Sequence, residues 1–488
     1  MPTSKSKALK GVLWSALERY SVQGIHFIVS IILARLLAPE DFGIIAIVMV
    51  FTTIFQTINE AGFSTALIHK QNRDELDYST ALITNISIGL VSYLIIFLTA
   101  PLIALYYEVP ILTQVMRVLS LTLIINAFGI VQIAKFTINV DFKSLAKASL
   151  IASIISGVIG IFVAYKFRNV YGIVSQSLIY SIINVILMWI IAKWCPRTFF
   201  SFARFKNLFD YAYKLILARL INVIFDDIYA LAIGKLYSSI QLGYYNRANS
   251  FRQVLSKDII NTIQRVSVPL LCEAQNNNER MTNVLIRFIH NTAAIVFPLL
   301  AGLMVLNKPF VSVLIGDKWL PAADVILLIC PIGFFYLIST FNRNVFNATG
   351  RTDLALKAEV LKKVFFVFIF LLTFRYSMNI LLLGLNVIAI FEMIYDTYFS
   401  RKQIGITLLQ QLKALSSIIT SSALMSFSIL LINPFLSFNP YVNLFVGLLV
   451  GIVVYGILAF AFNIANIRTM VIDYYHKYSP TLLSTKIR

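Results

Sequence analysis

Thirteen apolar segments, each long enough to cross a lipid bilayer, follow one another along this chain of 488 residues. A membrane-spanning helix needs about 20 mostly apolar residues, because the hydrocarbon core is about 30 Å thick. The segments fall at 11–37, 42–63, 79–105, 115–136, 145–165, 170–194, 211–236, 284–306, 322–345, 356–374, 378–399, 411–432 and 441–463. With 59% hydrophobic and only 13% charged residues, the chain is not a soluble enzyme. The pattern predicts an all-α polytopic membrane protein.

A fourteenth span at 242–268 is too polar to be found by hydropathy, but the distribution of basic residues supports it. With fourteen spans and both termini cytoplasmic, 28 of the 41 Lys and Arg residues lie in cytoplasmic segments, 9 in outer segments and 4 inside spans. This is the asymmetry that the positive-inside rule requires. Without the polar span, the basic stretches 343–363 and 401–413 would lie outside. The net charge of +19 is therefore mostly topological and needs no nucleic-acid partner.

Two internal similarities indicate a repeated architecture. Residues 17–43 and 217–243 share five identities in 27 positions at an offset of 200, and 142–148 is similar to 352–358. We therefore predict two pseudo-symmetric lobes of six helices, 1–200 and 201–405, with the two additional helices and a basic cytoplasmic tail at 406–488. Parallel repeats of this kind occur in secondary transporters, with the substrate site at the repeat interface. We read 11–37 as an uncleaved first helix, since it is too long for a signal peptide.

Polar residues collect on four predicted spans, 11–37, 42–63, 211–236 and 242–268. A charge at the bilayer centre costs at least about 2.5–3.5 kcal/mol, so such a residue usually faces a cavity or a partner. Spacings of three and four residues place the polar groups of the first three spans on one helical face, whereas 242–268 is polar over much of its surface, with Arg252 beside its main stripe. We predict a water-filled, mainly cationic cavity between the lobes. The candidate lining residues are Arg19, Gln23, His26, Gln56, Asn59, Arg219, Asn222, Asp226, Arg252, Gln253 and Lys257.

Several charged residues also have simpler interpretations. Arg19 lies about two turns into its helix, from where its side chain can extend to the cytoplasmic interface. Asp226 can serve a structural role by pairing with Arg19 or Lys257. Glu392 and Asp396 lie near a basic cytoplasmic loop, which favours an interface anchor over a proton relay.

Other patterns argue for packing and against catalysis. Ser149, Ser153 and Gly157, and likewise Gly447 and Gly451, form faces of small residues that suit helix packing. The three cysteines and four histidines are too scattered for a metal site, and the chain has no phosphate-binding glycine loop. We therefore expect a transporter rather than an enzyme, without a cofactor. The coupling ion, H⁺ or Na⁺, stays open.

Five local motifs resemble one family of membrane transporters. They are LKGVLWSALERY (9–20), ILARLLAPEDFG (32–43), EAGFSTAL (60–67), LGYYNRA (242–248) and NATGR (347–351). Together with the fourteen-span layout, the chain resembles the polysaccharide flippases of the MOP superfamily, the Wzx-type exporters of lipopolysaccharide O-antigen and colanic acid. Nothing in these motifs separates members of the family by sugar.

The resemblance implies a function and a location. A family member would move a polyprenyl-diphosphate-linked oligosaccharide across the bacterial cytoplasmic (inner) membrane by alternating access, for O-antigen or exopolysaccharide synthesis. Its partners would be the lipid-linked oligosaccharide, the bilayer, and the polysaccharide polymerase and chain-length machinery. The family is thought to line its cavity with helices 1, 2, 7 and 8. Arg19, Arg219, Arg252 and Lys257 could then offset desolvation of the diphosphate.

Two alternatives remain from the sequence. A multidrug exporter of the same superfamily usually needs an acidic cavity for cations, whereas this one is mostly basic. A membrane polymerase or glycosyltransferase would need a sizeable outer loop with catalytic groups, and no outer loop of this chain is long.

Overall fold

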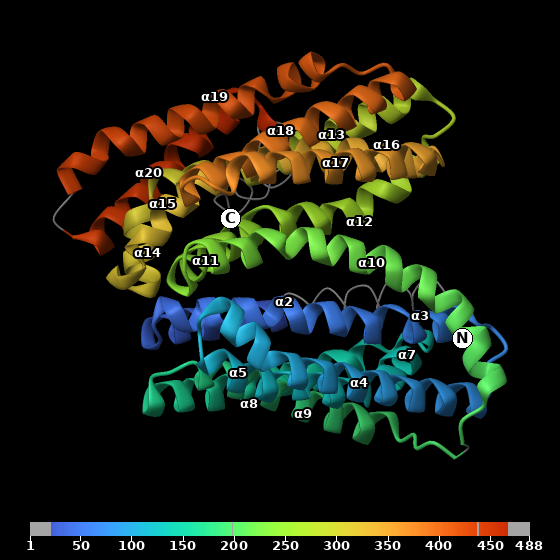
Figure 1. The fold of residues 1–488 in the computed structure, drawn as a ribbon. Coiled ribbons are helices and arrows are strands. Elements are labelled where there is room, and N and C mark those ends of the chain that lie inside the picture. The colour runs from blue at the N-terminus through green and yellow to red at the C-terminus, as the bar shows by residue number, and fades with distance from the viewer. Residues whose placement is uncertain (1–20, 198, 437–438, 467–488) are drawn as a thin grey trace, which may run out of the picture. The chain divides into compact units, whose positions relative to one another are not determined.

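A computed structural model describes residues 21–197, 199–436 and 439–466 of the chain (Figure 1). In these residues the regular structure is helical, and no strand occurs. The chain divides into two compact units, Met1–Asn246 and Arg247–Arg488. Arg19 and the start of the first predicted span lie outside the described residues.

Unit one begins with the helix Ser21–Leu36. The helices that follow are α2 (Pro39–Ala61), α3 (Phe63–His69), α4 (Glu75–Tyr107), α5 (Ile111–Leu119), α6 (Leu121–Ala127), α7 (Ile130–Ile138), α8 (Phe142–Phe167), α9 (Tyr171–Ala192) and α10 (Phe202–Leu236). The unit boundary falls within α11 (Ser239–Leu255).

Unit two continues from the second half of α11. Its helices are α12 (Lys257–Glu273), α13 (Asn278–Val305), α14 (Asn307–Ile315), η1 (Asp317–Trp319), α15 (Leu320–Ile329), α16 (Pro331–Ala348), α17 (Thr352–Thr373), α18 (Met378–Ile404), α19 (Leu408–Ile432), η2 (Asn433–Leu436), α20 (Pro440–Ala461) and η3 (Ile464–Asn466). Side-chain caps fix several of their starts; Thr407, for example, accepts from the backbone amide of Gln410.

The described helices confirm a multi-pass membrane fold. Eight are long and apolar enough to cross a bilayer, and ten spans result if each of two bent helix pairs counts as one. The predicted span 115–136 is bent by 42° between α6 and α7, and 322–345 by 41° between α15 and α16, where Pro331 starts the second helix. The other predicted spans coincide with helices that are shorter or more polar. The count of fourteen stays a prediction.

Helix ends follow the predicted repeat. The helix Ser21–Leu36 and α10 end at the matching positions Leu36 and Leu236, and α2 and α11 begin at the matching positions Pro39 and Ser239. The second similarity aligns Phe142 with Thr352, and these residues begin α8 and α17. The compact units divide after Asn246 and not near the predicted lobe boundary, because α10 packs against α2, α3 and α4. The arrangement in two six-helix lobes therefore stays a prediction.

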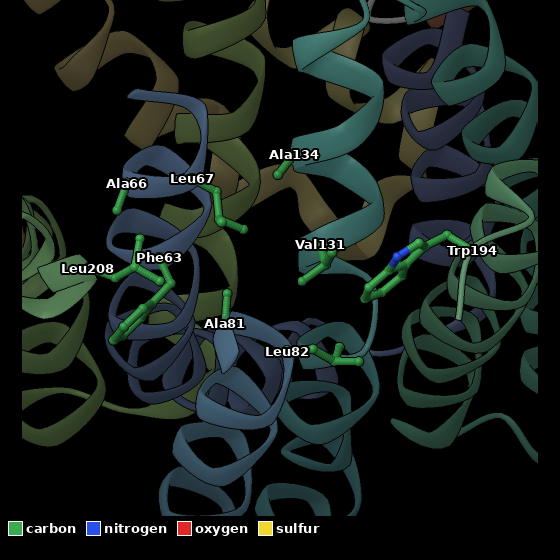
Figure 2. Packing of buried hydrophobic residues seen from close by; sticks show 9 residues of the cluster. All are labelled: Phe63, Ala66, Leu67, Ala81, Leu82, Val131, Ala134, Trp194 and Leu208. Atoms are coloured by element: carbon green, nitrogen blue, oxygen red, sulfur yellow. The ribbon is translucent and has the colours of Figure 1, made fainter. Parts of the chain in front are cut away.

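One apolar core of unit one joins α3, α4, α7 and the start of α10 (Figure 2). Phe63 and Leu67 lie one turn apart on α3 and are fully buried. Trp194, after α9, closes the cluster at one end and is 8% exposed. The remaining members are Ala66, Ala81, Leu82, Val131, Ala134 and Leu208.

A polar network anchors α10 beside this core. Lys70 Nζ lies 2.6 Å from the fully buried Asp77 carboxylate, and Arg204 donates to Asp74 over 2.8 Å. Trp194 Nε1 donates to Glu75 over 2.7 Å. A hydrogen bond from the Asp77 backbone amide lowers the pKa of the Asp74 carboxyl, and the Arg204 charge acts in the same direction. These contacts fix the start of α10 to the turn before α4.

The predicted small-residue faces do pack against other helices. A Cβ on Gly157 would lie 2.7 Å from Val29 Cγ2, and one on Gly447 would lie 2.6 Å from Leu306 Cδ2. Ser153 is fully buried on the same face as Gly157. The small side chains let neighbouring helices approach closely, so their predicted packing role is confirmed.

Candidate functional site

The predicted polar stripe of the seventh span lies on an exposed face of α10. Arg219, Asn222 and Asp226 are all exposed and follow spacings of three and four residues. The same helical face carries Ala212 and Ile216 earlier in α10, where both are buried in an apolar cluster. This face of α10 is therefore apolar and buried at Ala212 and Ile216, and polar and exposed from Arg219 to Asp226. No ion pair involves Arg219 within the described part of the chain.

His26 is held by other helices of unit one. Its Nε2 lies 3.4 Å from Ser153 Oγ on α8, and its Nδ1 lies 3.5 Å from Gln176 Nε2 on α9. The Tyr180 ring meets the imidazole edge-on, with centroids 5.3 Å apart. The structure thus gives His26 specific neighbours in the helix packing. Gln23, one turn earlier, is half-buried.

The two candidates on α2 lie in different surroundings. Gln56 is half-buried, whereas Asn59 is only 2% exposed. A Cβ on Gly89 of α4 would lie 3.5 Å from Asn59 Nδ2, so the amide lies against that helix. Among the described residues, neither polar atom of the Asn59 amide has a hydrogen-bond partner. Asn59 therefore lies in the interior of unit one in this structure.

The candidates of unit two lie around a break in the predicted span 242–268. α11 ends at Leu255 and α12 begins at Lys257, with Ser256 in a non-helical conformation. Arg252 donates from Nε and Nη2 to Asn249 Oδ1, over 3.2 and 2.7 Å. Arg252, Gln253 and Lys257 are half-buried. The polar segment is thus two helices, with cationic side chains on both sides of the break.

An ion cluster that the sequence did not predict joins α16, α17 and α18 in unit two. Arg343 lies 2.9 Å from Glu359, 2.9 Å from Asp396 and 3.8 Å from Glu392. Lys362 lies 3.3 Å from Glu392. The Asp396 and Glu392 side chains are only 1% and 12% exposed. With all five groups ionised, the cluster carries a net charge of −1.

The prediction that Glu392 and Asp396 anchor the helix at the membrane interface is therefore wrong. Both carboxylates point into the helix packing, where Ser339 Oγ also donates to Asp396 over 2.5 Å. The available signal was their spacing of four residues, which places both on one face of α18. The charge distribution predicts a cytoplasmic loop position for Arg343, whereas the structure places it inside α16.

The fold is shared with known transporters. The solved structure of the lipid II flippase MurJ in an inward closed conformation aligns with a TM-score of 0.75 and 16% identity, covering 94% of this chain and 100% of that one. An inward-facing multidrug resistance MATE family transporter of the MOP superfamily gives 0.61 and 14%, covering 78% and 94%. The chain therefore shares the fold of these two proteins.

Comparison of the sequence with known families and proteins defines the relatives of this chain more narrowly than the fold does. The family described as polysaccharide biosynthesis protein matches residues 32–324, more than half of the chain. The teichuronic acid biosynthesis protein TuaB of Bacillus subtilis is 24% identical, with 73% of this chain and 74% of that protein aligned. The succinoglycan biosynthesis transport protein ExoT of Rhizobium meliloti is also 24% identical (70% and 69%), and the lipopolysaccharide biosynthesis protein WzxC of Escherichia coli is 22% identical (74% and 74%).

This chain belongs to the polysaccharide biosynthesis protein family. The resemblance to polysaccharide flippases of the MOP superfamily is confirmed. The relatives and structural neighbours include transporters and flippases, in agreement with the prediction of a transporter.

Proposed function

We propose that this protein is a flippase that moves a polyprenyl-diphosphate-linked oligosaccharide across the bacterial cytoplasmic membrane by alternating access, for surface polysaccharide synthesis. One observation carries the proposal: in a chain of the polysaccharide biosynthesis family, the exposed face of α10 presents Arg219 and Asn222. The structural likeness to a lipid flippase supports the same reading.

The chemistry of these side chains suits the substrate. A guanidinium forms paired hydrogen bonds with phosphate oxygens and keeps its charge in a protein, so Arg219 can offset desolvation of the diphosphate. Arg252 donates to Asn249 Oδ1, so this contact orients its guanidinium through a neutral amide. Amide groups such as those of Asn222 and Gln253 can bind sugar hydroxyls. The polyprenyl tail would stay in the lipid.

The junction of α11 and α12 adds a second argument. Its one non-helical residue, Ser256, keeps helical hydrogen bonds on both sides, because its amide donates to the Arg252 carbonyl over 3.0 Å and its own carbonyl accepts from the Ile260 amide over 2.9 Å. Lys257 and Arg252 flank the break at Ser256. We place both termini in the cytoplasm, from the distribution of basic residues. The polysaccharide polymerase and chain-length machinery, and coupling to H⁺ or Na⁺, belong to the same proposal.

Translocation in proteoliposomes containing a lipid-linked oligosaccharide tests the proposal. Arg219→Ala and Arg252→Ala should each impair translocation while expression is preserved. The matched control is Arg375→Ala, an exposed arginine two residues after the end of α17, which should transport normally. Normal transport by both of the first two variants would contradict the role of these cationic side chains. Export of organic cations without lipid flipping would instead favour a multidrug exporter, and elongation of the oligosaccharide would favour a polymerase.

A further inference from the structure

Two glycines of unit one form an unusually close contact between helix starts. α2 begins at Pro39 and α11 begins at Ser239, and a glycine follows each start at the same spacing. A Cβ on Gly43 would lie 1.7 Å from the carbonyl oxygen of Ser239. A Cβ on Gly243 would lie 2.0 Å from the carbonyl oxygen of Pro39. The two backbones therefore touch, and only glycine fits at either position.

The contact is reciprocal under the internal repeat. In the alignment of 17–43 with 217–243, Gly43 corresponds to Gly243, and Pro39 corresponds to Ser239. Gly43 meets Ser239 and Gly243 meets Pro39, so each glycine contacts the repeat counterpart of the residue that the other glycine contacts. Such reciprocity is the signature of a two-fold contact, in which the same surface is used twice. The repeat predicted from the sequence therefore relates the two sides of this contact to each other.

The surroundings of the contact are apolar and closed. Leu242, next to Gly243, is fully buried, and its Cδ2 would lie 3.1 Å from a Cβ on Gly234 of α10. Ile47, one turn beyond Gly43, lies 3.4 Å from the same point and is also fully buried. At the two glycines themselves backbone meets backbone, so no side chain lies between the helix starts there.

We infer that Gly43 and Gly243 form a seal that closes one end of the transport path and must part when that end opens. This inference rests on the proposed transport function, since alternating access needs one closure at each end. The two glycines contribute equally to one contact. An added methyl group on either should hold the helix starts apart, because the obstructing atom is a backbone oxygen that no side-chain movement can displace.

The test uses a single reporter cysteine, Leu242→Cys, with Cys195, Cys272 and Cys330 replaced by serine. A membrane-impermeant maleimide is applied to each side of the membrane in turn, and the labelling rate is measured. Gly43→Ala and Gly243→Ala should each raise that rate about tenfold or more from one side. The double variant should be no faster than either single variant, because residues that share one contact are not additive. Gly24→Ala is the matched control, since a Cβ there meets nothing within 4 Å.

A second reporter separates opening from general loosening. Leu112→Cys lies on α5 and is also fully buried. An opened seal speeds labelling at position 242 alone. Faster labelling at both positions indicates general destabilisation and would overturn the inference. Unchanged labelling rates in both alanine variants would also overturn it. If neither alanine variant can be purified, the two reporter cysteines are compared in the protein that keeps both glycines. If the seal opens during transport, the cysteine at position 242 should be labelled faster than the one at position 112. Equal labelling rates overturn the inference. A protein that fails to flip lipid-linked oligosaccharide contradicts the proposed function, whatever the labelling shows.

Discussion

Removal of Arg343 should destabilise unit two strongly. In Arg343→Met, the Asp396 carboxylate, which is 1% exposed, loses the guanidinium that lies 2.9 Å away. The Ser339 hydroxyl remains as its hydrogen-bond donor. The formal charge of the cluster falls from −1 to −2, because Lys362 is then its one cation against three carboxylates. Removing one partner of a buried ion pair costs about 3–5 kcal/mol, because the remaining charge is buried without compensation. Since Glu392 keeps Lys362 at 3.3 Å, most of this loss comes from Asp396.

The free energy of unfolding, measured by SDS titration in mixed micelles and followed by circular dichroism, checks this magnitude. The double variant Arg343→Met with Asp396→Leu restores the net charge of −1 and should recover to within about 1 kcal/mol of the parent, because apolar replacement of a whole buried pair is often neutral. Arg351→Met, which removes an exposed pair with Asp353, is the control and should change little. A single variant within about 1 kcal/mol of the parent, or a double variant no better than the single, would refute the reasoning.

Two further predictions concern packing and topology. Gly172→Ala should lower the free energy of unfolding by about 1–3 kcal/mol, because its Cβ would lie 2.6 Å from Ala164 Cβ and 2.9 Å from Ala164 Cα. Gly456→Ala, where a Cβ meets nothing within 4 Å, should be neutral or stabilising by up to about 1 kcal/mol in the same titration. Cysteines introduced near Lys70 and Arg351 should react with an impermeant thiol reagent only in inverted vesicles; labelling from outside intact cells would contradict the cytoplasmic assignment of these loops.

The helices themselves could be predicted because their signals are local. Apolar length located the spans, and the internal repeat predicted matching helix ends, as at Leu36 and Leu236. The helical face of Arg219 and Asn222 followed from their spacing. Pairing between distant helices left no such local signal. Arg343, Lys362 and Asp396 come from three helices, and only packing shows that they meet.

The same limit applies to the candidate site. His26 and Asn59 are polar residues in predicted spans, and periodicity alone indicates a cavity for both. The structure places His26 against Ser153 and Gln176, and Asn59 against α4. A polar face on a membrane helix can turn toward a cavity or toward another helix, and periodicity does not distinguish the two.

The surroundings of each arginine separate a structural charge from one that can serve transport. Arg343 is paired with the carboxylates of Glu359 and Asp396, so an incoming diphosphate would have to displace buried anions and leave them unpaired. Arg219 lies exposed on α10, and Arg252 is half-buried and oriented by the neutral amide of Asn249. An anion that reaches the Arg219 guanidinium gains a charge-assisted hydrogen bond without stranding the buried carboxylates that hold Arg343. Positive charge in a span is therefore not sufficient for this role; Arg219 and Arg252, and not Arg343, are the residues whose loss should impair translocation of a diphosphate-linked substrate.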